Sequence, residues 1–452
     1  MTLRGKNPLS MAGFSNPTPQ GFEMLYFRIS RQFIGIGSFQ VLAMFRRGLF
    51  YAYLSIYLRY FLGLSATETT LFATLPMLLN ICFQTLVWGR LSDRRQLRRT
   101  LIVRGEVLGA AGTLIVWYLH TLPASRAAAG WVIILGLAAV EIFWSMSNIG
   151  WSALISDVYP ARERNAVQGR LASLGGLGRI AGVWIGGLLY DGMATRYEGW
   201  GFHEGTLFFV AAGVMLLSTI PLRWVPEGGI RDAETTRSGP VGPEDGSSRL
   251  FFIFLVAMMF INFGRNSIVI IQSQYLFLES GFHLDSRMLS YVYNTESGAI
   301  ILWGLLVGWL GNRLGNGKTV CVGAMIALAF LGIYATADHL PLVFLGSFLK
   351  GSAEVILMAS AYAFASVLIP ADQRGRRFSW FNATFFLSWG LAGTLMAGPL
   401  IDLMLSAGAA PVNAYRAAFV AAAMMTAAGL GLQVWLLFQR KGLRRRKEAE
   451  IG

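Results

Sequence analysis

Long apolar runs constrain this chain more than any other feature. Each has about 20 residues or more, enough to cross a ~30 Å hydrocarbon core as a helix. They lack the alternating polar and apolar faces of soluble helices, and only 14% of the 452 residues are charged. We therefore predict an all-α membrane protein with twelve transmembrane helices. The runs lie at 33–61, 69–91, 100–120, 129–153, 167–190, 204–225, 250–278, 288–311, 318–336, 340–368, 378–405 and 413–438.

The formal net charge of +14 is explained by topology better than by a nucleic-acid partner. If both termini lie on one side, the tails and loops of that side carry most of the 38 Lys and Arg residues. Basic residues gather in cytoplasmic loops. We therefore expect an integral, multi-pass protein of the cytoplasmic (inner) membrane with both termini in the cytoplasm. The loops of the other side carry only Arg59, Arg126, Arg196, Arg287 and Arg416.

A polar stretch at 226–249, rich in Gly, Pro and acidic residues, divides the apolar runs six and six. Such a stretch cannot bury a core and is typical of a flexible linker. We expect five parts, namely a cytoplasmic tail at 1–32, a six-helix bundle at 33–225, a cytoplasmic linker at 226–249, a second six-helix bundle at 250–438 and a basic cytoplasmic tail at 439–452.

The two expected bundles share sequence features in the same order. The hinge Gly-Arg-Leu-Ser-Asp-Arg at 89–94 recurs as Gly-Trp-Leu-Gly-Asn-Arg at 308–313. Arg47 matches Arg265, and the segment 187–191 matches 398–402, each beginning with Gly and ending with Asp. Such repeats indicate a duplicated six-helix unit. The halves are then pseudo-symmetric, with a solute site near the membrane midplane between them.

With these motifs the chain resembles the major facilitator superfamily of secondary transporters. The resemblance covers essentially the whole chain, but Gln96 stands where the family's hinge has Gly, and Asn312 replaces the second Asp. It implies transmembrane transport by alternating access, and no cofactor. It also implies that the hinge latches the halves in one state; the alternative is an anchor for topology alone. The expected conformational latch comprises Gly89, Asp93, Arg94, Arg98, Gly308 and Arg313.

Glycines in the fifth run are spaced as in the drug–proton antiporters of the same superfamily. Gly at these intervals makes a smooth face for close helix packing, and ordinary packing explains the spacing equally well. Val183 replaces the motif's Pro, and the fourth run has Glu141 and no Arg. Both departures weigh against multidrug export. The expected helix-packing residues are Gly178, Gly182, Gly186 and Gly187.

Charged residues inside the expected spans are the candidates for solute binding. Charges in the bilayer are costly and usually face a cavity or a partner. Arg47 and Arg265 are equivalent in the repeat, as are the paired arginines of the superfamily's organophosphate antiporters, and an anion between them suits the guanidinium fork. The alternative is that each Arg pairs with an acid of its own half. The expected substrate-binding residues are Arg47, Arg265, Arg46, Asn266, Gln272, Asn294 and Trp389.

Three acids inside the spans are the candidates for proton coupling. Burial disfavours a charged carboxylate, so such an acid can carry a proton. Glu141 and Glu296 have no evident counter-ion in the sequence, whereas Glu354 follows Lys350 at the i,i+4 spacing of a helical ion pair. We expect the coupling group among Glu141, Glu296 and Glu354.

Together these features predict a proton-coupled secondary transporter for a small organic solute, anionic or amphiphilic. A multidrug–proton antiporter and a lipid or lysolipid flippase remain alternatives. We expect a monomer in the lipid bilayer and no enzyme, because no nucleophile–base pair or phosphate-binding loop is present. Cys82 and Cys321 have no CxxC or His neighbour, so we expect neither a metal site nor a disulfide.

Overall fold

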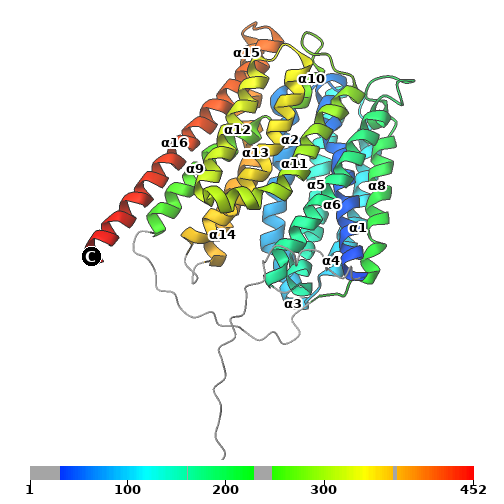
Figure 1. The fold of residues 1–452 in the computed structure, drawn as a ribbon. Helices are drawn as coiled ribbons and strands as arrows, with labels where there is room; N and C mark the ends of the chain where they lie inside the picture. The colour runs from blue at the N-terminus through cyan, green and yellow to red at the C-terminus, as the bar shows by residue number, and fades with distance from the viewer. Residues whose placement is uncertain (1–30, 160, 229–246, 370–373, 452) are drawn as a thin grey trace, which may run out of the picture.

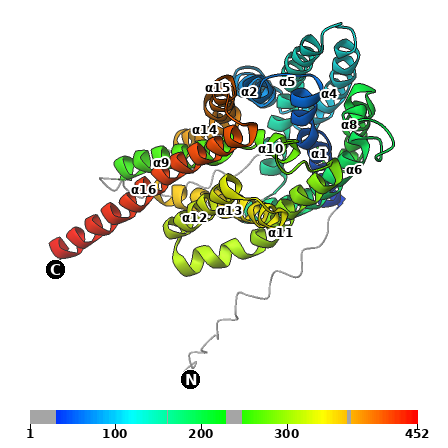
Figure 2. The ribbon, with the colours of Figure 1, turned by 90° about the horizontal axis from the view of Figure 1, so that it is seen from above.

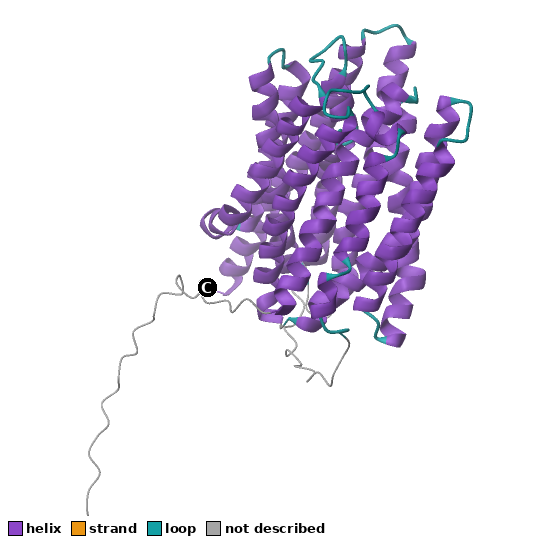
Figure 3. Cartoon of the chain, turned by 90° about the vertical axis from the view of Figure 1, so that its right-hand side faces the viewer, coloured by secondary structure: helices purple, strands orange, loops and turns teal. Residues whose placement is uncertain are grey.

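The computed structural model describes residues 31–159, 161–228, 247–369 and 374–451. Every regular element in these segments is helical (Figure 3). Several helices continue through short π-helical or 3₁₀ turns. The elements are α1 (Arg31–Ile56, extended by Tyr57–Phe61), α2 (Ala66–Phe83, extended by Gln84–Trp88), α3 (Gly89–Arg95), α4 (Arg99–His120), α5 (Arg126–Val158), α6 (Ala161–Tyr190), α7 (Trp200–His203), α8 (Thr206–Ser218, then Pro221–Trp224), α9 (Ser247–Ser267), α10 (Ile271–Phe277), α11 (Ser286–Leu314), α12 (Asn316–Thr336), α13 (Leu340–Leu368), α14 (Arg374–Ala392, extended by Gly393–Ala397), α15 (Gly398–Ser406) and α16 (Pro411–Ile451).

The expected membrane spans correspond to these helices. Among the described residues, eleven stretches are long and apolar enough to cross a membrane. The helix α1, which carries Arg46 and Arg47, is a further long helix. One expectation needs correction, because the seventh span is broken between Ser267 and Ile271. The helix α16 continues to Ile451, through most of the segment expected as a basic tail. The expected N-terminal tail and most of the expected linker, residues 229–246, lie outside the described residues.

The helices form two groups that lie side by side (Figures 1 and 2). In the N-terminal group, α1 to α8, α1 packs on α6 and α4 packs on α5; in the C-terminal group, α9 to α16, α9 packs on α16 and α12 on α13. The groups touch where α6 meets α11 and where α2 meets α14 and α15. We call the side where α1 begins and α16 ends the terminal face, and the opposite side the distal face.

Glycines let α6 approach α1 closely. A Cβ at Gly178 would overlap the carbonyl oxygen of Val41 on α1, and one at Gly182 would overlap that of Phe45. A Cβ at Gly186 would lie 2.7 Å from the carbonyl oxygen of Leu49, also on α1. Gly187 faces the other group, where its Cβ would lie 2.8 Å from the carbonyl oxygen of Ser286. These glycines therefore set two helix contacts, one inside a group and one between groups.

Candidate functional site

Glu296 on α11 lies between two cations from different helix groups. Its Oε1 accepts a hydrogen bond from Nη2 of Arg179 on α6 at 2.8 Å, and its Oε2 accepts one from Nζ of Lys350 on α13 at 3.0 Å. Lys350 also donates to Oε1 of Gln272 at 2.5 Å, and Gln272 donates to the Tyr334 hydroxyl at 2.7 Å. The sequence interpretation that Glu296 lacks a counter-ion was wrong, because its partners come from helices distant in sequence.

Arg265 on α9 is bonded inside its own group. Its Nη1 donates to Oε2 of Glu354 on α13 at 2.6 Å, and its Nε donates to Asn262 at 3.1 Å. The expected Lys350–Glu354 pair is not formed, because Lys350 turns to Glu296 and Glu354 turns to Arg265. Arg265 therefore follows the alternative expectation, in which the arginine pairs with an acid of its own half.

The two adjacent arginines of α1 have different surroundings, as their ~100° separation around the helix requires. Arg46 is buried, donates to Oε2 of Glu106 on α4 at 2.9 Å and lies 4.5 Å from the ring centroid of Trp144. Glu106 also accepts from Ser147 at 2.8 Å. Arg47 is exposed, and its side chain has no hydrogen bond or ion pair within the described part of the chain.

Glu141 on α5 is the least neutralised buried acid of the three candidates. Its side chain is buried and accepts a hydrogen bond from Asn80 on α2. Arg46 and Arg47 lie within electrostatic range of its carboxylate, but neither forms an ion pair with it in the described structure. The carboxylate is therefore held by a neutral amide, with an exposed cation nearby.

Several polar atoms predicted to bind solute are buried and have no bonding partner among the described residues. They are Nδ2 of Asn266, Oδ1 of Asn294 and Nη2 of Arg265. Buried polar groups are normally hydrogen-bonded, so such atoms mark places for water or solute. Trp389 is half-buried and packs against the apolar core, and Gln272 is already bonded twice.

The first hinge is anchored within the N-terminal group. Arg98 donates from Nε to Oδ2 of Asp157 on α5 at 3.0 Å and from Nη1 to the Ser92 hydroxyl. Gln96, which stands where the family has Gly, adopts the left-handed conformation with φ of 51°. Gly89 begins α3 and Arg94 is exposed, whereas the side chain of Asp93 lies outside the described part.

Glu227, which follows α8, holds the same hinge and was missed by the sequence analysis. Its Oε1 accepts from the backbone N–H groups of Arg98 and Thr100, both at 3.0 Å, and its Oε2 lies 3.4 Å from Nε of Arg99. These N–H groups begin α4, where a helix carries partial positive charge. The sequence signal that could have indicated this role is the position of Glu227, an acid directly after a span, at the start of the segment interpreted as a linker.

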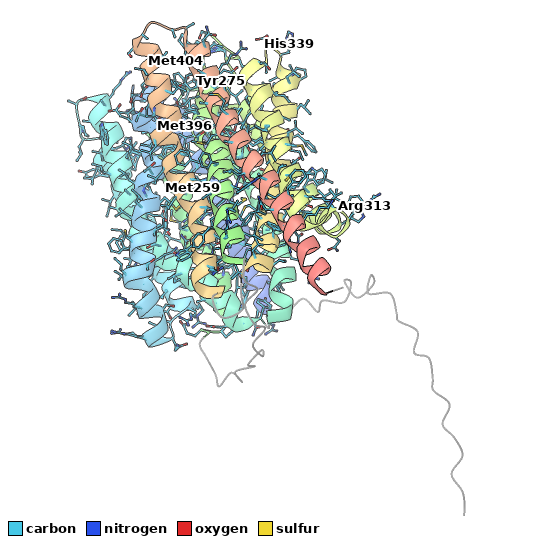
Figure 4. The ribbon with its side chains drawn as sticks, turned by 90° about the vertical axis from the view of Figure 1, so that its left-hand side faces the viewer. Met259, Tyr275, Arg313, His339, Met396 and Met404 are labelled. Carbon is cyan, nitrogen blue, oxygen red and sulfur yellow. The ribbon has the colours of Figure 1, made fainter. Side chains whose placement is uncertain are left out.

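The second hinge is more open. A Cβ at Gly308 would meet no atom within 4 Å, and Arg313 stacks on Trp309 with 5.4 Å between its Cζ and the ring centroid. Gly315, with φ of 83°, separates α11 from α12. Figure 4 shows Arg313 at the edge of the molecule, away from the core of the bundle.

Comparisons with known proteins agree with this architecture. The family model described as "Major Facilitator Superfamily" matches residues 36–272 and 250–452. No curated protein sequence matches the chain significantly.

Solved transporter structures share the fold at low sequence identity. A bacterial homologue of the human lysosomal transporter Spinster, in an inward-facing and unoccupied conformation, has a TM-score of 0.70 at 15% identity over 93% of this chain and 99% of that chain. The nucleoside transporter NupG has a TM-score of 0.67 at 14% identity, covering 90% and 99%. The peptide transporter POT in complex with sulfate has a TM-score of 0.64 at 16% identity, covering 92% and 95%.

Proposed function

The chain belongs to the Major Facilitator Superfamily, and from this premise we propose that it transports a small organic anion together with a proton by alternating access. The observation that carries the proposal is the contrast among its membrane-embedded cations. Arg46, Arg179, Arg265 and Lys350 are each bonded to a Glu, whereas Arg47 is exposed and has no partner among the described residues. A cation kept inside a membrane without a counter-ion suits an anionic solute.

Glu141 is the proposed proton carrier. It is buried, held only by Asn80 among the described residues, and within electrostatic range of Arg47. When Glu141 is charged it partly balances Arg47; when it is protonated, Arg47 attracts an anion more strongly. The anion and the proton therefore favour each other's binding and cross together. Glu296 is less suited, because two cations stabilise its charged form.

Binding of the solute class is tested on purified protein by thermal shift with a panel of carboxylates and phosphates, because a ligand of the folded state stabilises it. We expect Arg47→Ala to abolish the shift by an anion and to leave any shift by a cationic drug. Arg104→Ala is the matched control, because Arg104 is also exposed without a partner among the described residues but lies near the start of α4 rather than within the span. A cationic drug that stabilises both proteins, with no anion active, indicates multidrug export instead.

Coupling is tested in proteoliposomes with the anion found by that panel. We expect a pH gradient, acidic on the side of the added anion, to drive accumulation by the unaltered protein. Glu141→Gln should retain exchange of the anion across the membrane and lose the response to the gradient. Equal uptake with and without the gradient by the unaltered protein contradicts proton coupling.

A further inference from the structure

A Gly-x3-Asp segment occurs at equivalent places in both helix groups. Gly187 lies in the last turn of α6 and Asp191 directly follows that helix, whereas Gly398 and Asp402 lie on α15, 211 residues later. Both segments are near the distal face. Each faces the first turn of a helix of the other group, α11 in one case and α2 in the other.

Asp402 completes the N-terminus of α2 from the opposite group. Its Oδ1 accepts from the backbone N–H of Ala66 at 2.9 Å, and its Oδ2 accepts from that of Thr67 at 2.8 Å. The next N–H, of Glu68, is bonded to the Ser65 hydroxyl at 3.1 Å. The first N–H groups of a helix have no partner within it and carry partial positive charge. A carboxylate is therefore a favourable partner for them.

Asp191 makes the related contact with the N-terminus of α11. Its Oδ2 accepts from the hydroxyl of Ser286, the first residue of α11, at 2.9 Å. Its Oδ1 accepts from the backbone N–H of Ala194 in its own turn at 2.9 Å. Nearby, Arg287 donates to the carbonyl oxygen of Met193 at 3.1 Å. The second contact thus uses a side-chain hydroxyl where the first uses two backbone groups.

The glycines make both contacts possible. A Cβ at Gly398 would lie 2.8 Å from Cα of Thr67, and a Cβ at Gly187 would lie 2.8 Å from the carbonyl oxygen of Ser286. Both distances are too short for real side-chain contacts. The glycine therefore admits the first turn of the partner helix, and the aspartate one turn later bonds it.

Hydroxyl contacts join the groups between these two segments. Ser55 and Ser273 bond at 2.5 Å, and Thr394 bonds Thr70 and Thr74 at 2.7 Å each. Thr70 and Ser273 also donate to the carbonyl oxygens three residues before them, of Thr67 and Ile270, at 2.7 and 3.1 Å. The distal face is thus closed by bonds between α1, α2, α10 and α14 as well as by the aspartates.

We propose that the two Gly-x3-Asp segments are a duplicated distal gate, which holds the transporter closed at this face and must release for it to open there. The inference rests on the alternating access of the proposed function. Each segment bridges the groups, so the groups cannot separate at this face without breaking both contacts. The Asp402 contact is the stronger, because it joins a carboxylate to two backbone N–H groups at a helix N-terminus.

Cysteine accessibility at the closed face tests the gate. In a Cys82→Ser, Cys321→Ser background, Ser273→Cys places a thiol at a position that is 2% exposed in the closed face. We measure its modification by a membrane-impermeant maleimide, without solute or gradient. We expect Asp402→Ala to speed modification about tenfold and Asp191→Ala about threefold. The free energy of a hydrogen bond to a charged group is large enough to shift the equilibrium between closed and open faces by these factors or more.

The matched control is Asp338→Ala. Asp338 is also an acid near the distal face, but its ion pair, 2.5 Å to Nη2 of Arg416, lies within the C-terminal group. We expect the modification rate of this variant to stay within about twofold of the background. A rise equal to that of Asp402→Ala overturns the proposal, since loss of any distal acid would then suffice.

The glycines give a second test that removes no charge. Gly398→Ala should raise the modification rate about as much as Asp402→Ala does. Gly332→Ala should leave the rate unchanged, because a Cβ at Gly332 would meet no atom within 4 Å. If Asp402→Ala yields no monodisperse protein on size exclusion, Gly398→Ala decides. Unchanged modification in folded Gly398→Ala and Asp402→Ala overturns the gate. The modification assay needs no solute. The gate proposal can therefore be contradicted while the anion-transport proposal is supported, and the anion-transport proposal can be contradicted while the gate is supported.

Discussion

Arg47 and Arg265 occupy equivalent positions of the duplicated sequence, yet their surroundings differ. Arg265 is 5% exposed and bonded to Glu354 and Asn262, whereas Arg47 is exposed without a partner among the described residues. The duplication has kept the cation and changed its neighbours. In the C-terminal group Arg265 and Lys350 are each bonded to a Glu of the same group, whereas Arg47 of the N-terminal group has no partner among the described residues. The two arginines would therefore contribute differently to the anion site that we propose.

The largest expected effect follows from loss of the two ion pairs of Glu296, one within the C-terminal group and one with the N-terminal group. Glu296→Gln leaves Arg179 and Lys350 without their carboxylate, and breaking a buried ion pair costs about 3–5 kcal/mol. We expect a clear fall in the midpoint of thermal unfolding of the detergent-purified protein. Asp338→Asn, which breaks an exposed pair, is the control with little effect. Equal unfolding midpoints for the two variants contradict the structural role of Glu296.

A smaller loss of stability is expected from replacing the two arginines, and it tests their difference directly. Arg265→Ala removes the buried partner of Glu354 and Asn262 and should destabilise the fold by about 1–3 kcal/mol. Arg47→Ala breaks no described bond and should stay within about 0.5 kcal/mol of the unaltered protein. Chemical or thermal unfolding in the same detergent measures both. If Arg47→Ala proves the more destabilising, Arg47 is a structural residue and the anion proposal loses its basis.

The smallest expected difference lies between the two hinges. Glu227→Ala removes the acceptor of two N–H groups at the start of α4, which should cost about 1–2 kcal/mol. Arg313→Ala in the second hinge removes only a contact with Trp309 and should cost less than about 0.5 kcal/mol. Unfolding midpoints check both variants. A larger loss from Arg313→Ala contradicts the view that the first hinge is the better anchored.

The helices and their packing faces could be predicted from the sequence, because span length and glycine spacing are local properties. The divergence of Arg46 and Arg47 followed from the ~100° step of a helix. The partners of Glu296 and Glu354 could not be predicted, since they depend on which helices are neighbours in space. The i,i+4 spacing of Lys350 and Glu354 was misleading for this reason. Glu227 was missed because its acceptor role depends on the position of α4.

The hydroxyl contacts of the distal face bear on what separation of the two groups leaves unbonded. Thr70 and Ser273 each donate to the carbonyl oxygen three residues before them and also meet a hydroxyl of the other group. When the groups part, Thr70 and Ser273 keep these carbonyl partners, so neither of the two donors is left unsatisfied. Separation of the groups therefore leaves fewer buried donors unsatisfied than it would if every hydroxyl were bonded only across the groups.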